Sequence, residues 1–190
     1  LIVRGHTKGT MAAVLKGKEV CIHVSGYVAK GVATIANGSG MDVYAFDPFI
    51  SDEAMQKEGV TPLHSVEELY QACHFISLHI PANDKTKKSI NYDLLKLMPK
   101  GATLVNTARK EVICEDSLKK IFAERKDFKY ISDIAPDCHQ DLLQYENRYY
   151  ATPKKQGAET AEANINAGIA AAKQIVGFFK HGDKTFQVNK

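Results

Sequence analysis

Short apolar runs alternate with longer amphipathic segments along most of this chain. Each apolar run is the length of a buried strand and too short for a core helix. We expect the strands at residues 20–24, 43–46, 74–80, 102–106 and 130–134.

The segments between these runs carry helix signals. Ser51 and Ser65 are suitable N-cap residues followed by acidic residues, and Ser65 and Glu68 have the capping-box spacing. We expect short helices to begin at these two serines, and longer helices at 27–36, 92–98, 115–124 and 158–180. Because strands that alternate with helices build parallel sheets, the pattern predicts an α/β fold, a Rossmann-like doubly wound parallel sheet with helices on both faces.

Composition narrows the functional classes. The net charge of +3 is small and the basic residues are spread along the chain, so we expect no nucleic-acid partner. No apolar run approaches the ~20 residues of a membrane span, so we expect no membrane contact. The four cysteines form no C-x-x-C pair, which predicts no metal site and reduced thiols in a cytoplasmic protein. They are Cys21, Cys73, Cys114 and Cys138.

The turn after the first predicted strand has the character of a phosphate-binding turn. In such turns small residues let the backbone approach a pyrophosphate, and the following helix offers its N–H groups. Gly26 matches the second glycine of the G-x-G-x-x-G/A pattern and Ala29 the third, but Val24 replaces the first. The alternative is a glycine that serves only a strand-to-helix turn.

Asp47 ends the second predicted strand, 21 residues after Gly26. An acidic residue at about this spacing accepts hydrogen bonds from the adenosine ribose of NAD and repels the 2′-phosphate of NADP. The spacing therefore predicts NAD as the cofactor. The alternative is an ordinary aspartate at a strand end before Pro48.

Three stretches resemble the D-2-hydroxyacid dehydrogenase family. They are Ser-Leu-His-Ile-Pro at 77–81, Gly-Ala-Thr-Leu-Val-Asn-Thr-Ala-Arg at 101–109 and Ala-Thr-Pro-Lys at 151–154. The ending at 186–190 is similar to that of short 3-phosphoglycerate dehydrogenases. The resemblance implies a two-lobed homodimeric enzyme with a small-molecule substrate, of which this chain lacks most of the substrate lobe.

The same resemblance implies a division of the chain into three parts. Residues 1–16 lead in from the substrate domain, 17–180 form the NAD-binding domain, and 181–190 return to the substrate domain. It also implies the cofactor-binding residues, which are Gly26, Tyr27, Val28, Asp47, Pro81, Thr107, Ala108, Arg109 and Asp133. Pro81 and Thr107 have a plainer alternative role, which is to end their strands.

The implied catalytic residues are Arg109 and Lys154. The planar fork of Arg109 suits a substrate carboxylate and the C2 oxygen. Lys154 follows Thr-Pro, where the family usually has the acid–base histidine. Cys138 falls where the family places the partner glutamate, and Asp137 is a neighbour that offers an alternative carboxylate.

The expected activity is hydride transfer between 3-phosphoglycerate, a 2-hydroxy acid of serine biosynthesis, and NAD. We expect the fragment alone to be inactive, because half of the cleft is missing. Two alternatives stay open at this point. One is a glyoxylate or hydroxypyruvate reductase, and the other is a non-catalytic dinucleotide-binding or interaction module.

Overall fold

The computed structural model describes residues 15–24, 26–145, 147–153 and 160–188, and only the backbone of Tyr27. The chain divides into two compact units, Leu1–Pro153 and Lys154–Lys190. The predicted domain boundaries at residues 16 and 180 stay predictions.

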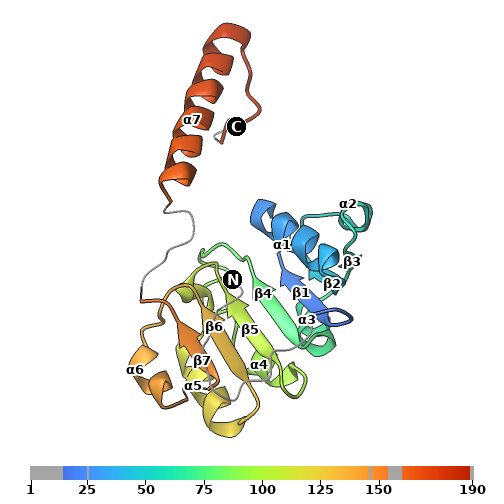
Figure 1. Cartoon of the computed structure of the whole chain (residues 1–190), viewed down its shortest axis with the longest axis vertical. Coiled ribbons are helices and arrows are strands. Elements are labelled where there is room, and N and C mark those ends of the chain that lie inside the picture. The colour runs from blue at the N-terminus through green and yellow to red at the C-terminus, as the bar shows by residue number, and fades with distance from the viewer. Residues whose placement is uncertain (1–14, 25, 146, 154–159, 189–190) are drawn as a thin grey trace. The chain divides into compact units, whose positions relative to one another are not determined.

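The strands of the first unit form one seven-stranded sheet in the order β3-β2-β1-β4-β5-β6-β7 (Figure 1). All pairs are parallel, and β1 lies between β2 and β4, so the direction of winding reverses at β1. This arrangement confirms the predicted Rossmann-like doubly wound sheet. The strands are β1 (Glu19–His23), β2 (Asp42–Phe46), β3 (Thr61–Pro62), β4 (Phe75–Leu78), β5 (Thr103–Asn106), β6 (Lys129–Ser132) and β7 (Tyr149–Ala151).

Helices pack on both faces of the sheet, because neighbouring residues of a strand point to opposite faces. Ile22 and Ala45 belong to a core cluster with α1 and α2, whereas Cys21 and Leu104 belong to a second cluster with α3, α4 and α5. The elements are α1 (Tyr27–Gly38), α2 (Asp52–Lys57), α3 (Val66–Ala72), α4 (Tyr92–Leu97), η1 (Lys110–Val112), α5 (Glu115–Glu124), α6 (His139–Leu142) and η2 (Leu143–Tyr145).

The predicted helix starts are confirmed at both serines. The Ser51 hydroxyl accepts the N–H of Ala54, and the Ser65 hydroxyl accepts the N–H of Glu68 at 3.0 Å. The Glu68 carboxylate accepts the N–H of His64 at 2.9 Å, one residue before the position that the capping box predicts. Local hydrogen bonds therefore fix the starts of these short helices.

The predicted strands all form, with bounds that shift by one or two residues. The third and fifth predicted strands are shorter than expected, since β4 ends at Leu78 and β6 ends at Ser132. The pattern did not reveal β3 and β7, which have two and three residues. Strands this short carry too few residues for a periodic signal, and they form because a neighbouring strand is there to pair with.

The prediction of four reduced thiols is wrong for one pair of cysteines. Cys21 in β1 and Cys73 after α3 form a disulfide, with their Cα atoms 5.8 Å apart. Both are completely buried, while Cys114 and Cys138 are free. The long separation of the cysteines along the sequence was a poor guide to their pairing, because the fold brings Cys73 back to β1, 52 residues after Cys21. The argument for a cytoplasmic location that rested on four reduced thiols therefore no longer holds.

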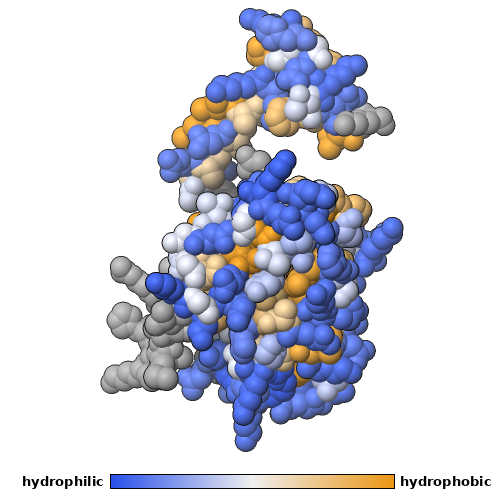
Figure 2. All heavy atoms as spheres, turned by 90° about the vertical axis from the view of Figure 1, so that its right-hand side faces the viewer, coloured by the Kyte–Doolittle hydropathy of each residue, from blue (hydrophilic) through white to orange (hydrophobic). Residues whose placement is uncertain are grey.

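The second unit contains α7 (Ala161–His181), which begins at the N-cap Thr160 and ends at Gly182 in the left-handed region. The start predicted at residue 158 lies outside the described residues. No residue of α7 is buried, and its surface carries hydrophobic side chains (Figure 2), among them Ile165, Ile169 and Phe179.

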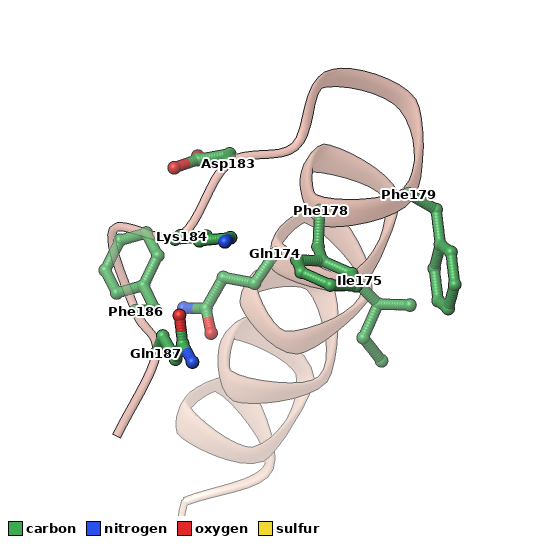
Figure 3. A pocket seen from close by; sticks show the side chains of 8 residues that line it. All are labelled: Gln174, Ile175, Phe178, Phe179, Asp183, Lys184, Phe186 and Gln187. Atoms are coloured by element: carbon green, nitrogen blue, oxygen red, sulfur yellow. The ribbon is translucent and has the colours of Figure 1, made fainter. Parts of the chain in front are cut away.

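The residues after α7 turn back along the helix and enclose a hollow of about 430 Å³ (Figure 3). Gln174 points toward Gln187, while Phe179 lies on the other side of the helix. None of the predicted site residues lines this hollow. Among the described residues, no helix is long and apolar enough to cross a membrane.

Candidate cofactor-binding site

The predicted site residues gather at the edge where the parallel strands end. The register pairs His23 with Phe46 and Leu78, and carries on from Leu78 through Asn106 to Ser132. The strands therefore end in one row. The residues that follow them are Asp47, Val24, His79, Thr107, Asp133 and Thr152. In doubly wound sheets, ligands bind at this edge, where the winding reverses.

The turn between β1 and α1 is open at the position of the predicted phosphate. Gly26 is the N-cap of α1, and a Cβ added to it would meet no heavy atom within 4 Å. Because the N-cap is a glycine, it offers no side-chain acceptor to the first-turn N–H groups of α1, and such groups can donate to an anion. Val28, in that turn, is 69% exposed, and the side chain of Tyr27 lies outside the described residues.

Val24 adopts a backbone angle that normally requires glycine. Its φ is +71°, in the left-handed region where a β-branched side chain is strongly disfavoured. The backbone at position 24 thus takes a conformation that suits glycine although the first glycine of the pattern is missing. The conformation is held by neighbouring bonds, among them that from the Val24 N–H to the Phe46 carbonyl at 2.9 Å.

Asp47 stands at the end of β2 and is 8% exposed. Its Oδ1 accepts the N–H of Phe49 at 2.9 Å, which orients the carboxylate beside the turn. The neighbouring His23 is buried, and burial lowers the pKa of its imidazole to about 4, although the charge of Asp47 acts in the opposite direction. His23 is therefore neutral at neutral pH, and the Asp47 carboxylate provides the negative charge at this strand end.

Asp133 contains the one buried polar side-chain atom without a hydrogen-bond partner among the described residues, its Oδ1. Its backbone is fixed on both sides: its N–H donates to the Asn106 carbonyl at 3.2 Å, and its carbonyl accepts the Thr152 hydroxyl. A buried acceptor without a partner is costly unless a ligand donates to it. An amide N–H, such as that of the nicotinamide carboxamide, has the right chemistry.

The loop after β5 presents Thr107, Ala108 and Arg109. Thr107 and Ala108 are half-buried, and Arg109 is exposed with Nη1 3.0 Å from the Ala108 carbonyl. Pro81, at the end of the neighbouring segment, is also exposed. The structure therefore brings these four predicted residues to the same edge as Asp133.

Neither of the two residues considered for the place of the partner glutamate, Asp137 and Cys138, supplies a free carboxylate. Asp137 forms an ion pair with Lys110 at 2.5 Å, and its side chain is 77% exposed. Cys138 is buried, and burial, with the nearby charge of Glu115, raises the pKa of its thiol to about 12. The thiol is thus protonated at neutral pH. The predicted proton carrier Lys154 lies outside the described residues.

Three residues with clear roles at this edge were not predicted from the sequence. Asn106 bonds to the loop that follows it, Thr152 bonds to Asp133, and both carboxylate oxygens of Glu115 accept N–H groups of the loop after β6. The position of Asn106 at the end of an apolar strand was an available signal, because asparagine at such a position often holds a turn.

The doubly wound sheet and the glycine turn before its first helix are typical of a dinucleotide-binding domain. The sequence matches the D-isomer specific 2-hydroxyacid dehydrogenase, NAD binding domain, over residues 3–153. The chain therefore belongs to this family, the predicted resemblance is confirmed, and NAD is its cofactor.

Relatives in several organisms share this domain. The D-3-phosphoglycerate dehydrogenase of Methanocaldococcus jannaschii is 34% identical over 164 residues, which cover 85% of this chain and 31% of the relative. The hydroxypyruvate reductase of Thermotoga maritima is 32% identical over 172 residues, 85% of this chain and 54% of the relative.

A solved structure matches nearly the whole chain. The NAD+-bound 3-phosphoglycerate dehydrogenase of Entamoeba histolytica is 45% identical, with a TM-score of 0.85, and covers 96% of this chain. The match covers 58% of that enzyme. The chain thus spans between about a third and somewhat more than half of the length of these relatives.

Proposed function

We propose that this chain is the NAD-binding part of an oxidoreductase that acts on 3-phosphoglycerate. The observation that carries the proposal is the 45% identity, over 96% of the chain, to an NAD+-bound enzyme of that name. The row of polar residues at the strand ends supports the proposal independently, since it offers acceptors and backbone donors at the positions that a dinucleotide needs.

In this proposal the chain holds the two halves of NAD at opposite ends of the row. Gly26, Tyr27 and Val28 carry the pyrophosphate at the N-terminus of α1, and Asp47 accepts the ribose hydroxyls. Asp133 accepts the carboxamide N–H with its unpaired Oδ1. Bound NAD supplies the acceptor for the hydride, so the residues of the chain only bind, orient and move a proton.

The nicotinamide side is bordered by Pro81, Thr107, Ala108 and Arg109. Arg109 binds the substrate carboxylate and polarises the C2 oxygen, since its guanidinium keeps its charge and has few bonds to its own chain. The exposure of Arg109 supports this role, because a residue that contacts a substrate from another lobe must face outward in this domain.

Lys154 is the proposed proton carrier. A lysine with an ordinary pKa of ~10.4 is protonated at neutral pH, and a carboxylate beside it would raise that pKa further. Two residues of the loop after β6 support the assignment, because Cys138 is a neutral thiol and Asp137 is paired with Lys110. The missing glutamate therefore removes a group that would hinder a lysine.

The likeness to a hydroxypyruvate reductase, 32% identical over 85% of this chain, favours hydroxypyruvate as a second candidate substrate. The substrate contacts that would separate the two lie mainly in the other lobe of a two-lobed enzyme. The same chemistry at C2 serves both substrates, so Arg109 and Lys154 keep their roles in either case. The homodimer and the cytoplasmic location stay predictions from the sequence.

A chimera tests the activity. This chain would replace the matching residues of the Entamoeba histolytica enzyme, and the absorbance of NADH would be followed with 3-phosphoglycerate or, in reverse, hydroxypyruvate. We expect turnover with 3-phosphoglycerate in the chimera and none with the 190-residue chain alone. Preference of the chimera for hydroxypyruvate would move the proposal to the second candidate.

Calorimetry on the chain itself tests the cofactor half. Asp47 would place a negative charge against the 2′-phosphate of NADP, so we expect NAD to bind about tenfold or more tightly than NADP. Asp47→Asn should narrow this preference, while Asp42→Asn, a change at an exposed aspartate at the start of β2, serves as the control. Equal binding of NAD and NADP to the unchanged chain would remove Asp47 from the site.

A further inference from the structure

Asn106 is a completely buried polar residue at the carboxyl end of β5. Its Nδ2 donates to the Arg109 carbonyl at 3.0 Å and to the Tyr130 hydroxyl oxygen at 3.3 Å. Its Oδ1 accepts the N–H of Ala108 at 3.0 Å. Both amide hydrogens and one oxygen lone pair are therefore engaged, and two of the three bonds reach the loop that carries Arg109.

The backbone of Asn106 extends the connection to the next strand. Its carbonyl accepts the N–H of Asp133 at 3.2 Å. One residue thus joins the loop at 107–109 to the aspartate whose Oδ1 is unpaired. Tyr130, on β6, is also completely buried, so its hydroxyl is a fixed acceptor for the Asn106 amide.

The chemistry of an amide is specific to this arrangement. Aspartate has the same shape but cannot donate two hydrogen bonds, and serine is too short to reach the Arg109 carbonyl and the Ala108 N–H together. Because the site is buried, water cannot easily replace a lost partner there. The loop therefore depends on this side chain for its conformation.

We propose that Asn106 is a positioning residue whose side chain holds the 107–109 loop in place beside Asp133, as the wall of the nicotinamide half of the NAD site. The inference rests on the proposed function, which assigns these residues to that half. Asn106 acts through its neighbours and does not touch the cofactor itself.

The test compares ligands that fill different parts of the site. NAD occupies both halves, whereas ADP fills only the adenosine and pyrophosphate part at β1 and β2. We would measure both affinities by calorimetry for the 190-residue chain and for Asn106→Asp and Asn106→Ser. We expect both variants to bind NAD about tenfold more weakly and ADP within about twofold of the unchanged chain.

Asn91→Ala is the matched control. Asn91 caps α4 through the N–H of Leu94 at 3.1 Å and is no part of the strand-end row, so its loss should lower the unfolding midpoint without changing either affinity. A second measurement is independent of ligands. Hydrogen exchange at the Ala108 N–H should become faster in Asn106→Ser, even where global stability is only slightly reduced.

The outcomes separate this proposal from the wider function. Equal weakening of NAD and ADP, or unchanged NAD binding in Asn106→Ser, would overturn the positioning role. If Asn106→Asp fails to fold, the serine variant and the exchange rate decide. If the unchanged chain binds NAD no more tightly than ADP, the nicotinamide half adds no affinity and the assignment of the loop to that half is overturned. Failure to bind either ligand would overturn the proposed function as well.

Discussion

At the residue scale, the phosphate turn is held in a conformation that its own sequence opposes. Val24 has a φ of +71°, and Lys88 is the other non-glycine residue with a positive φ among the described residues, at +55°. Such a conformation persists only where surrounding bonds determine it. Val24 therefore carries a local conformational cost at the proposed phosphate-binding turn.

Replacement of Val24 by glycine should relieve this cost. We expect Val24→Gly to raise the free energy of unfolding by about 1 kcal/mol and to tighten NAD binding, because the β-branched side chain also crowds the turn. Thermal unfolding and calorimetry would measure the two effects. Lys88→Gly is the control: it should also stabilise the chain but leave NAD affinity unchanged. Weaker NAD binding in Val24→Gly would mean that the phosphate lies elsewhere.

His23 makes the stability of the domain sensitive to acid. Burial lowers its pKa from 6.5 to about 4, so the unfolded chain binds the proton more readily than the folded chain between these values. The contribution of the neutral His23 to the free energy of unfolding is fully present above pH 6.5 and is lost as the pH falls through 4. The total loss is about 3 kcal/mol.

Urea unfolding between pH 7 and pH 4 would measure this loss. We expect the free energy of unfolding of His23→Gln to fall less steeply between pH 7 and pH 4, because glutamine does not titrate. His64→Gln, at an exposed histidine, is the control and should leave the slope as it is. An identical pH dependence in His23→Gln would show that other groups cause the acid sensitivity.

At the scale of elements, the disulfide ties α3 to the strand that leads into the phosphate turn. Cys21 lies three residues before Val24, and Cys73 directly follows α3. Tyr70 of α3 also packs edge-on against His23, with ring centroids 5.8 Å apart. The covalent bond and the ring contact therefore hold the same two elements together.

Reduction of this bond should destabilise the domain. A cross-link between residues 52 apart removes unfolded-state entropy worth about 4 kcal/mol at most. We expect a lower urea midpoint after reduction, and the same loss in Cys73→Ser without reductant. Cys114→Ser, at a free cysteine, should change little. Alkylation of the unfolded, unreduced chain followed by mass spectrometry would contradict the bond if four thiols were labelled.

At the scale of the whole molecule, the predicted cofactor contacts that the structure describes all belong to the unit that ends at Pro153. The other unit contributes α7, in which no residue is buried and several large hydrophobic side chains are exposed. The first unit therefore has a core of its own and contains all the proposed cofactor contacts that the structure describes.

A chain that ends at Pro153 should accordingly bind NAD as well as the 190-residue chain, within about twofold. Its unfolding midpoint should also stay the same, because removing α7 takes away no buried side chain. Calorimetry and thermal unfolding would measure both, with a chain that ends at His181 as the control. A clear loss of affinity would show that residues beyond Pro153 take part in the site.

Local signals in the sequence determined the elements and their order. The apolar runs, the caps at Ser51 and Ser65 and the spacing of Gly26 and Asp47 depend on residues near one another along the chain. Their interactions form within one turn or one strand, so they can be recognised without a fold. The family motifs likewise identified strand ends that lie in one row at the edge of the sheet.

Only the tertiary structure decided which distant residues meet. The bond between Cys21 and Cys73, the contact of Asn106 with Tyr130 24 residues away, and the unpaired Oδ1 of Asp133 depend on which strands are neighbours in the sheet. The same is true of the short strand β7, which forms because β6 is beside it. Local preferences fix where an element begins and ends, but long-range pairing follows from the order of the strands, and a residue's partners follow from that order.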